Sequence, residues 1–253
     1  KHYSQIHLIM KPDGKYRFTV DFRQLNACIK SSSWPIPKIQ DIFQDIGATR
    51  PRYFCIMDMT EGYYQLPLDE ASRDFTAMYT TAGLYRWRRV PMGLKHAGIH
   101  FQKMIETEVL HGIVGTGCAV YQDDVCVYAS TKEELLTRMS KVLERFQEYG
   151  VKLKPSKCKF GLEEVNLLGH VINQHGTTFS RTKLQGVIEF ERPTTAKMLH
   201  QFLGLINYYR SHVYMISDLT KPLYDIMKVY SKKKGQKIDW TPEGIQAFEA
   251  IKK

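Results

Sequence analysis

Short apolar runs, rich in β-branched and aromatic residues and separated by polar turn residues, predict β-hairpins in the first 130 residues. Residues 4–26, "SQIHLIMKPDGKYRFTVDFRQLN", contain two such runs around Pro12-Asp13-Gly14, residue types that favour turns. Residues 74–90 predict a second hairpin that turns at residues 81–83, and residues 118–130, "CAVYQDDVCVYAS", predict a third. An apolar strand is also expected over residues 53–57, directly before Asp58.

After residue 130 the apolar period becomes helical. The clearest helix carries apolar residues at helical spacing: Leu135, Leu136, Met139, Val142, Leu143 and Phe146. A Ser130-x-x-Glu133 capping box predicts its start and Gly150 its end. We expect another helix over residues 98–110, strands again over 157–173, and helices over 182–190, 199–206, 219–229 and after Thr241-Pro242. A polar break near residues 174–181 is the expected boundary between an α+β part and a helical part.

Composition limits the class of protein. Of the 253 residues, 43% are hydrophobic, which is enough for one large core or two modest ones. Lys and Arg outnumber Asp and Glu by 36 to 26, and the formal charge of +10 suits a polyanionic partner, although many solvated surfaces are also basic. Five scattered cysteines without a C-x-x-C pair indicate reduced thiols in an intracellular protein. No apolar run approaches the roughly 20 residues of a membrane span, and the missing initiator Met suggests a piece of a longer chain.

Two adjacent acids, Asp123 and Asp124, interrupt the third hairpin, where packing gives no reason for charge. Taken alone, the stretch fits an ordinary Asp-rich turn equally well. Together with Asp58, however, these acids would place three carboxylates in one region. Such a cluster suits Mg²⁺, which prefers oxygen ligands and shares its coordination with substrate phosphates. A pair of these ions can activate a 3′-hydroxyl and stabilise a leaving pyrophosphate, so the acids suggest nucleotidyl transfer.

Six motifs make this interpretation specific: "DFRQLN", "MDMTEGYYQLPLDE", "VPMGLKHAGIHFQKMIE", "YQDD", "LKPSKCKFGLEEVNLLGHVI" and "QFLGLINYYR". In this order and at these separations the chain resembles the reverse transcriptase of a gypsy-type LTR retrotransposon Pol polyprotein. The resemblance implies an α+β right-hand polymerase fold, with an antiparallel palm sheet backed by helices and a mainly helical thumb. Residues 1–175 would form partial fingers and the palm, and residues 176–253 the thumb and the start of the connection towards a missing ribonuclease H domain.

The resemblance also implies roles for single residues. Asp58, Asp123 and Asp124 would be the catalytic triad that binds Mg²⁺, with Mn²⁺ as an alternative. Lys11 and Arg17 would reach the incoming triphosphate, and a solvated strand face is their alternative role.

Further family positions concern the nucleotide and the primer. Tyr63 would lie beneath the nucleotide sugar and exclude a 2′-hydroxyl, with core packing as the alternative. Met92 and Gly93 fall on the segment that covers the nucleotide. Leu168, Gly169 and His170 resemble the start of the primer grip, although His170 fits a plain surface histidine equally well.

Two positions depart from the family pattern. Relatives usually have Asn where this chain has His96, and Pro where it has Gly98. Because Gly98 removes a rigid φ at a helix start, the surface that covers the nucleotide is expected to be looser.

The implied function is an RNA- and DNA-templated DNA polymerase that copies a primed RNA or DNA template from dNTPs into retrotransposon cDNA. In relatives this unit is part of a Gag-Pol polyprotein with protease, ribonuclease H and integrase. One alternative is a degenerate or domesticated remnant that binds nucleic acid without catalysis. Another is an RNA-dependent RNA polymerase, which the aromatic Tyr63 and the gypsy-like thumb disfavour.

Overall fold

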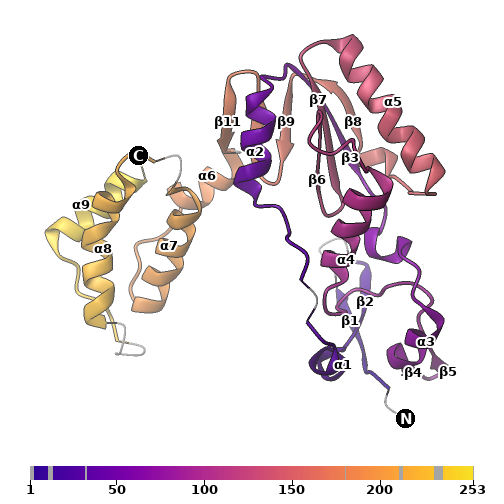
Figure 1. Cartoon of the computed structure of the whole chain (residues 1–253). Coiled ribbons are helices and arrows are strands. Elements are labelled where there is room, and N and C mark those ends of the chain that lie inside the picture. Colours follow the sequence, from indigo (N-terminus) through magenta and orange to yellow (C-terminus); the bar gives the residue numbers. More distant parts are fainter. Residues whose placement is uncertain are drawn as a thin grey trace. The chain divides into compact units, whose positions relative to one another are not determined.

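The computed structural model describes residues 3–10, 14–31, 33–179, 181–210, 213–230 and 236–252, without the side chains of residues 181–183 (Figure 1). The chain divides into two compact units. The first comprises Lys1–Leu168 and Ile172–Thr177, and the second comprises Gly169–Val171 and Thr178–Lys253. Within the described ranges, no helix has the length and apolar character needed to cross a membrane.

Strands and helices alternate along the first unit. The strands up to the unit boundary are β1 (Ile6–Met10), β2 (Tyr16–Val20), β3 (Tyr53–Asp58), β4 (Met78–Thr80), β5 (Gly83–Tyr85), β6 (Cys118–Tyr121), β7 (Asp124–Ala129), β8 (Lys159–Leu162) and β9 (Glu164–Leu167). The helices are α1 (Arg23–Cys28), α2 (Ile39–Ala48), α3 (Glu70–Arg73), α4 (Ala97–Met104), with a π-helical continuation over Ile105–Val109, and α5 (Lys132–Glu148). β1 pairs with β2 and β4 with β5, which confirms two of the predicted hairpins.

A four-stranded antiparallel sheet in the order β6-β7-β3-β8 forms the centre of the first unit. Side chains alternate between its two faces, so Cys55 lies on one face and its neighbour Phe54 on the other. The Cys55 face packs against Phe101 of α4 and Phe146 of α5. The Phe54 face packs against Ile46 of α2. Burial on both faces explains why β3 is a nearly continuous apolar run that ends at Asp58, and why β7 is one that begins at Asp124.

The second unit is mainly helical. Its helices are α6 (Arg181–Ile188), α7 (Ala196–Tyr208), α8 (Ile216–Tyr230) and α9 (Pro242–Ile251). α9 begins as predicted, because the Thr241 hydroxyl oxygen accepts a hydrogen bond from the Gly244 backbone N–H at 3.1 Å. The predicted apolar face of α7 is buried against α8 and α9 through these residues: Leu199, Phe202, Leu203, Ile206, Leu223, Ile226 and Phe248.

The predicted start of α5 is wrong. α5 begins after Thr131 rather than Ser130, since the Thr131 hydroxyl oxygen accepts from the Glu134 backbone N–H at 3.2 Å. The Ser130 backbone N–H instead donates to the Glu134 carboxylate at 3.1 Å. The expected boundary near residues 174–181 includes the change of unit between Thr177 and Thr178, and it also contains a strand that was not predicted. This strand, β11 (Gly176–Phe179), has a Thr-Thr-Phe run that favours strand structure, and it pairs with β10 (His170–Asn173).

Candidate active site

Asp58 and Asp124 lie opposite each other on two neighbouring strands. β3 and β7 pair so that the last residue of β3 meets the first residue of β7. Both acids fall on the sheet face that carries Cys126, because side chains two residues apart on a strand share a face. The Met59 backbone N–H donates to the carbonyl oxygen of Asp123 at 3.0 Å, which ties the hairpin tip to the end of β3. The three predicted acids therefore lie at one end of the central sheet.

The charges of these acids are unfavourable to one another. Burial raises the pKa of Asp124, and the charges of Asp123 and Asp58 raise it further. The charge of Lys157 instead lowers the pKa of Asp124. Nζ of Lys157 lies 2.8 Å from Oδ2 of Asp58, and this hydrogen bond is the main cause of the raised pKa of Lys157. The backbone N–H of Lys154 donates to the Asp58 carbonyl oxygen at 2.8 Å, which holds the turn with Lys157 against β3. The negative charge of the three acids attracts cations, and the Lys157 ammonium group supplies part of the neutralising positive charge.

The donor chemistry of the site fits a hard divalent cation, because three carboxylates offer oxygen ligands, and the raised pKa of Asp124 shows that its negative charge lacks compensation. In the part of the chain that the structure describes, no group of three or more His, Cys, Asp or Glu side chains is arranged to hold a metal ion. The Lys157 ammonium group lies 2.8 Å from Oδ2 of Asp58, so it is close enough to compete with a cation for that carboxylate. The residues therefore fit Mg²⁺ or Mn²⁺ in type, and their side chains must rearrange around Asp58 to bind it.

Tyr63 lies half-buried between the core and the acidic turn. Its ring packs edge-on against Phe101 with the ring centroids 5.8 Å apart, and its hydroxyl donates to Oε1 of Gln122 at 3.3 Å. Burial raises the pKa of Tyr63, and the charge of Asp123 contributes to the rise. The ring packs against the core, as the alternative interpretation expects, while the hydroxyl reaches the turn that carries the acids.

An asparagine of α1 holds the segment that contains Met92 and Gly93. Nδ2 of Asn26 donates to the carbonyl oxygen of Gly93 at 2.8 Å, and its Oδ1 accepts from the backbone N–H of Lys95 at 2.6 Å. Gly93 has a φ of +87°, which glycine adopts without strain. Met92 is half-buried. The structure thus fixes this segment through a contact that the sequence did not predict.

Arg17 is exposed on β2, in the hairpin predicted to reach the triphosphate. Burial raises the pKa of Tyr64, and the charge of Arg17 is close enough to oppose that rise. Tyr64 stacks on Trp87 with ring centroids 5.3 Å apart. The ring centroid of Phe18, the residue next to Arg17, lies 6.1 Å from that of Trp87. Arg17 therefore approaches the residue that follows the predicted sugar contact. Lys11 lies outside the described residues.

The two departures from the family pattern lie at the start of α4. His96 is the N-cap residue with a φ of +65°, and in the described part of the chain both of its ring nitrogens are buried without a hydrogen-bond partner. A Cβ on Gly98 would lie 3.2 Å from the Tyr63 hydroxyl oxygen and 3.5 Å from Nε2 of Gln122. The glycine therefore leaves space for these two side chains.

Leu168 and Gly169 form the two-residue turn between β9 and β10. Their φ angles of +50° and +79° match a hairpin turn that needs positive φ at both central residues. His170 follows at the start of β10 and is 6% exposed, so the alternative of a surface histidine is wrong. The rings of Phe179 and Tyr208 bury it, with centroids 4.7 and 5.8 Å from the imidazole.

Three polar residues of this region escaped the sequence analysis: Asn26, Gln102 and Lys157. Each bonds to partners distant in sequence, for example 67 residues away for Asn26 and 99 for Lys157. Asn, Gln and Lys are common on any protein surface, so only the family motifs that contain these residues could have indicated their importance.

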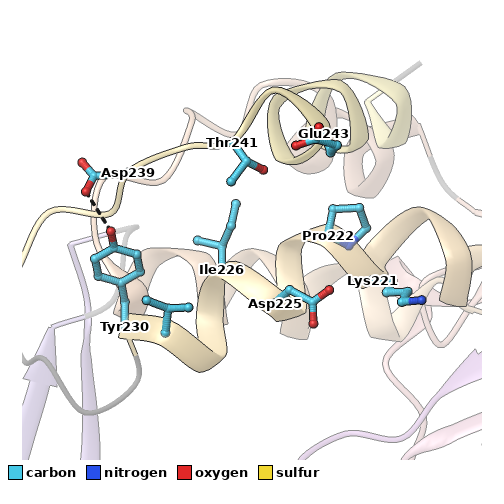
Figure 2. A pocket seen from close by; sticks show the side chains of 9 residues that line it. Lys221, Pro222, Asp225, Ile226, Tyr230, Asp239, Thr241 and Glu243 are labelled. Carbon is cyan, nitrogen blue, oxygen red and sulfur yellow. Dashed lines mark hydrogen bonds between the residues drawn. The ribbon is translucent and has the colours of Figure 1, made fainter.

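A cavity of about 540 Å³ lies between α8 and the segment that leads into α9 in the second unit (Figure 2). Ile226 and Pro222 contribute apolar surface to it, and Glu243 lies at its α9 side. The Tyr230 hydroxyl donates to the Asp239 carboxylate at 2.8 Å at one end. None of the predicted site residues lines this cavity.

The chain has relatives among known proteins that cover most of its length. Two Drosophila melanogaster relatives, the retrovirus-related Pol polyproteins from transposons 297 and 412, are 32% and 33% identical over 96% and 94% of this chain. The Pol polyprotein from transposon gypsy is 29% identical over 84% of the chain, which confirms the resemblance to gypsy-type elements. The chain spans only 23% and 19% of the length of the first two relatives.

Solved structures confirm the right-hand polymerase fold. The foamy viral protease-reverse transcriptase in complex with double-stranded DNA is 28% identical, with a TM-score of 0.88 over 99% of this chain and 51% of the other. Its complex with an RNA/DNA hybrid is 27% identical, with a TM-score of 0.82 over 99% of this chain and 33% of the other. The family described as reverse transcriptase (RNA-dependent DNA polymerase) matches residues 9–172. The chain therefore belongs to the reverse transcriptase family.

Proposed function

We propose that the protein is an RNA- and DNA-templated DNA polymerase that makes retrotransposon cDNA from dNTPs. The observation that carries this proposal is the register of β3 and β7, which sets Asp58 opposite Asp124 with Asp123 beside them. The bound nucleic acids in the titles of the similar structures, double-stranded DNA and an RNA/DNA hybrid, support a primed template as the partner. The formal charge of +10 suits that polyanion.

In this proposal Asp58, Asp123 and Asp124 hold two Mg²⁺ ions, for which Mn²⁺ can substitute. The ions supply activation of the primer 3′-hydroxyl and neutralisation of the leaving pyrophosphate. The carboxylates hold their ligands at the end of a rigid sheet, and positioning of this kind provides most of the catalysis in phosphoryl transfer. Lys157 must release Asp58, or share it, when a cation binds.

The remaining predicted residues orient the substrates. Arg17 and Lys11 contact the triphosphate, Tyr63 lies below the sugar, and the segment of Met92 and Gly93 covers the nucleotide. The proximity of Arg17 to Tyr64 and the clamp by Asn26 support this assignment, since both bring the proposed contacts towards one region.

The larger parts of the chain receive the roles expected of the family. Residues 1–175 act as partial fingers and palm, and residues 176–253 as the thumb and the start of the connection. Leu168, Gly169 and His170 contact the primer in this assignment.

A second candidate is a degenerate or domesticated reverse transcriptase that binds nucleic acid without catalysis. The ion pair of Lys157 with Asp58 favours it, because a lysine then neutralises a carboxylate that a polymerase needs for metal. The departures at His96 and Gly98 also favour it.

Primer extension on poly(rA)/oligo(dT) with Mg²⁺ distinguishes the two candidates. We expect the wild type to extend the primer and Asp123→Asn to be inactive, while both bind the primer-template equally, because affinity comes mainly from phosphate contacts elsewhere. Asp41→Asn, at an exposed acid of α2, is the matched control and should extend normally. Substantial extension by Asp123→Asn would contradict the mechanism. Binding by the wild type without extension would favour the remnant.

A further inference from the structure

We propose that Gln122, the residue between Tyr121 and the two acids, is a specificity-determining residue that fixes the Tyr63 hydroxyl and so sets the discrimination against ribonucleotides. The inference rests on the proposed function, in which Tyr63 lies below the nucleotide sugar. It assigns the selectivity to a pair of side chains, whereas the family resemblance assigns the exclusion of a 2′-hydroxyl to Tyr63 alone.

Two contacts hold the Tyr63 side chain, one at each end. Phe101 packs edge-on against the ring, with centroids 5.8 Å apart, and this contact limits how far the ring can shift into the core. At the other end, the hydroxyl donates to Oε1 of Gln122 at 3.3 Å. Without this hydrogen bond the hydroxyl end could swing about the contact with Phe101. The hydrogen bond therefore decides where the edge of the ring meets a bound sugar.

The position of Gln122 is itself fixed by a buried amide. Gln122 has a φ of +52°, in the left-handed region that non-glycine residues rarely adopt. Its backbone N–H donates to Oε1 of Gln102 at 2.5 Å. Gln102 is 0% exposed, and its Nε2 donates both to the Val120 carbonyl oxygen at 3.1 Å and to Oε1 of Glu106 at 2.8 Å. The Gln102 amide uses its oxygen and both hydrogens, so it cannot rotate without losing buried hydrogen bonds.

The hydrogen bonds continue one turn along the same helix, at Glu106. Oε2 of Glu106 accepts from Nε1 of Trp34 at 3.2 Å. An unbroken series thus runs from Trp34 through Glu106, Gln102 and Gln122 to Tyr63. Gln102 at the centre of the series is buried and its neighbours are half-buried, so a change at one member is expected to alter the positions of the others.

Gly98 borders the same pair of side chains. A methyl group there would lie 3.2 Å from the Tyr63 hydroxyl oxygen, which is closer than most such contacts, and 3.5 Å from Nε2 of Gln122, which is ordinary contact. We therefore expect Gly98→Ala to push the two side chains apart and lower the selectivity, although it leaves both hydrogen-bonding groups in place. This variant tests the geometry independently of their chemistry.

A double-mutant cycle tests the proposal. Tyr63→Phe removes the hydroxyl and keeps the ring, and Gln122→Met keeps the length of the side chain without its acceptor. Each single change should lower the ratio of kcat/KM for dATP to that for ATP by about 2- to 10-fold, the effect of one hydrogen bond. The double variant should fall no further than the single variants, because both remove the same interaction. Gln147→Met, at an exposed position on α5, is the matched control and should keep the wild-type ratio.

The measurements separate the possible outcomes. A general loss of folding would lower kcat/KM for both nucleotides equally, so a changed ratio with kcat for dATP within about twofold of wild type supports the specific role. An unchanged ratio in Gln122→Met, or fully additive effects in the cycle, would overturn the inference while extension by the wild type upholds the proposed function. If the wild type extends no primer with either nucleotide, the proposed function fails and the inference with it.

Discussion

Asn26→Ala should weaken dNTP binding, because Asn26 holds the segment proposed to cover the nucleotide. The change removes the hydrogen bonds to the Gly93 carbonyl oxygen and the Lys95 backbone N–H, at 2.8 and 2.6 Å. Each such bond contributes about 0.5–1.5 kcal/mol net, and water can replace part of it because Asn26 is only half-buried. A loss of about 1–2 kcal/mol corresponds to a rise in KM for dNTP of about 5- to 30-fold.

Steady-state extension over a range of dNTP concentrations measures this effect. We expect kcat to change less than KM, since the acids proposed to act on the transition state lie at the end of the β3–β7 pair. Gln24→Ala, at an exposed position of the same helix, is the control. Asn26→Asp should be intermediate, because the carboxylate still accepts from Lys95 but repels the Gly93 carbonyl oxygen. A folded Asn26→Ala protein with unchanged KM for dNTP would refute the role of this segment.

Other predictions concern the charges. Lys157→Ala should tighten Mn²⁺ binding in calorimetry several-fold by freeing Asp58, whereas Lys159→Ala should not; equal affinities would show that the ion pair does not compete with metal. Burial and then the charges of Asp123 and Asp58 raise the pKa of Asp124, so its stabilising contribution is present below the unfolded pKa of about 3.8 and is lost as pH rises through the raised value. Asp124→Asn should therefore raise the free energy of unfolding in urea with EDTA at pH 7 and flatten its dependence on pH, and an unchanged profile would contradict this. Affinity for primer-template should fall log-linearly between about 50 and 200 mM salt, and a flat dependence would argue against contacts to phosphates.

Much of the central sheet was predictable because apolar strands that end in acids leave a distinct pattern. The strand before Asp58 and the hairpin around Asp123 follow from alternation and residue type alone. The start of α5 was ambiguous, since Ser130 and Thr131 each stand three residues before a glutamate. Which hydroxyl caps the helix depends on where β7 ends, and that is set by its pairing with β3.

Contacts between distant segments were not predictable from local patterns. His170 looks polar in sequence, but it is buried by Phe179 and by Tyr208, which lie 9 and 38 positions further along the chain. The ion pair of Lys157 with Asp58 likewise depends on strand pairing that no local periodicity reveals. Tertiary packing decides such positions, and hydrophobic pattern contributes little to them.

The pairing of β3 with β7 makes the active site vulnerable to a kind of mutation that changes no functional residue. Deleting one residue within β3, such as Cys55, would shift the strand by one position against β7 or move its end. Because neighbouring side chains point to opposite faces, Asp58 would then face away from Asp124 or lie beside a different residue. A deletion that preserves the reading frame in an apolar strand can therefore abolish the proposed polymerase activity while every sequence motif remains intact. A count of gene copies with intact motifs would then overstate the number of active copies.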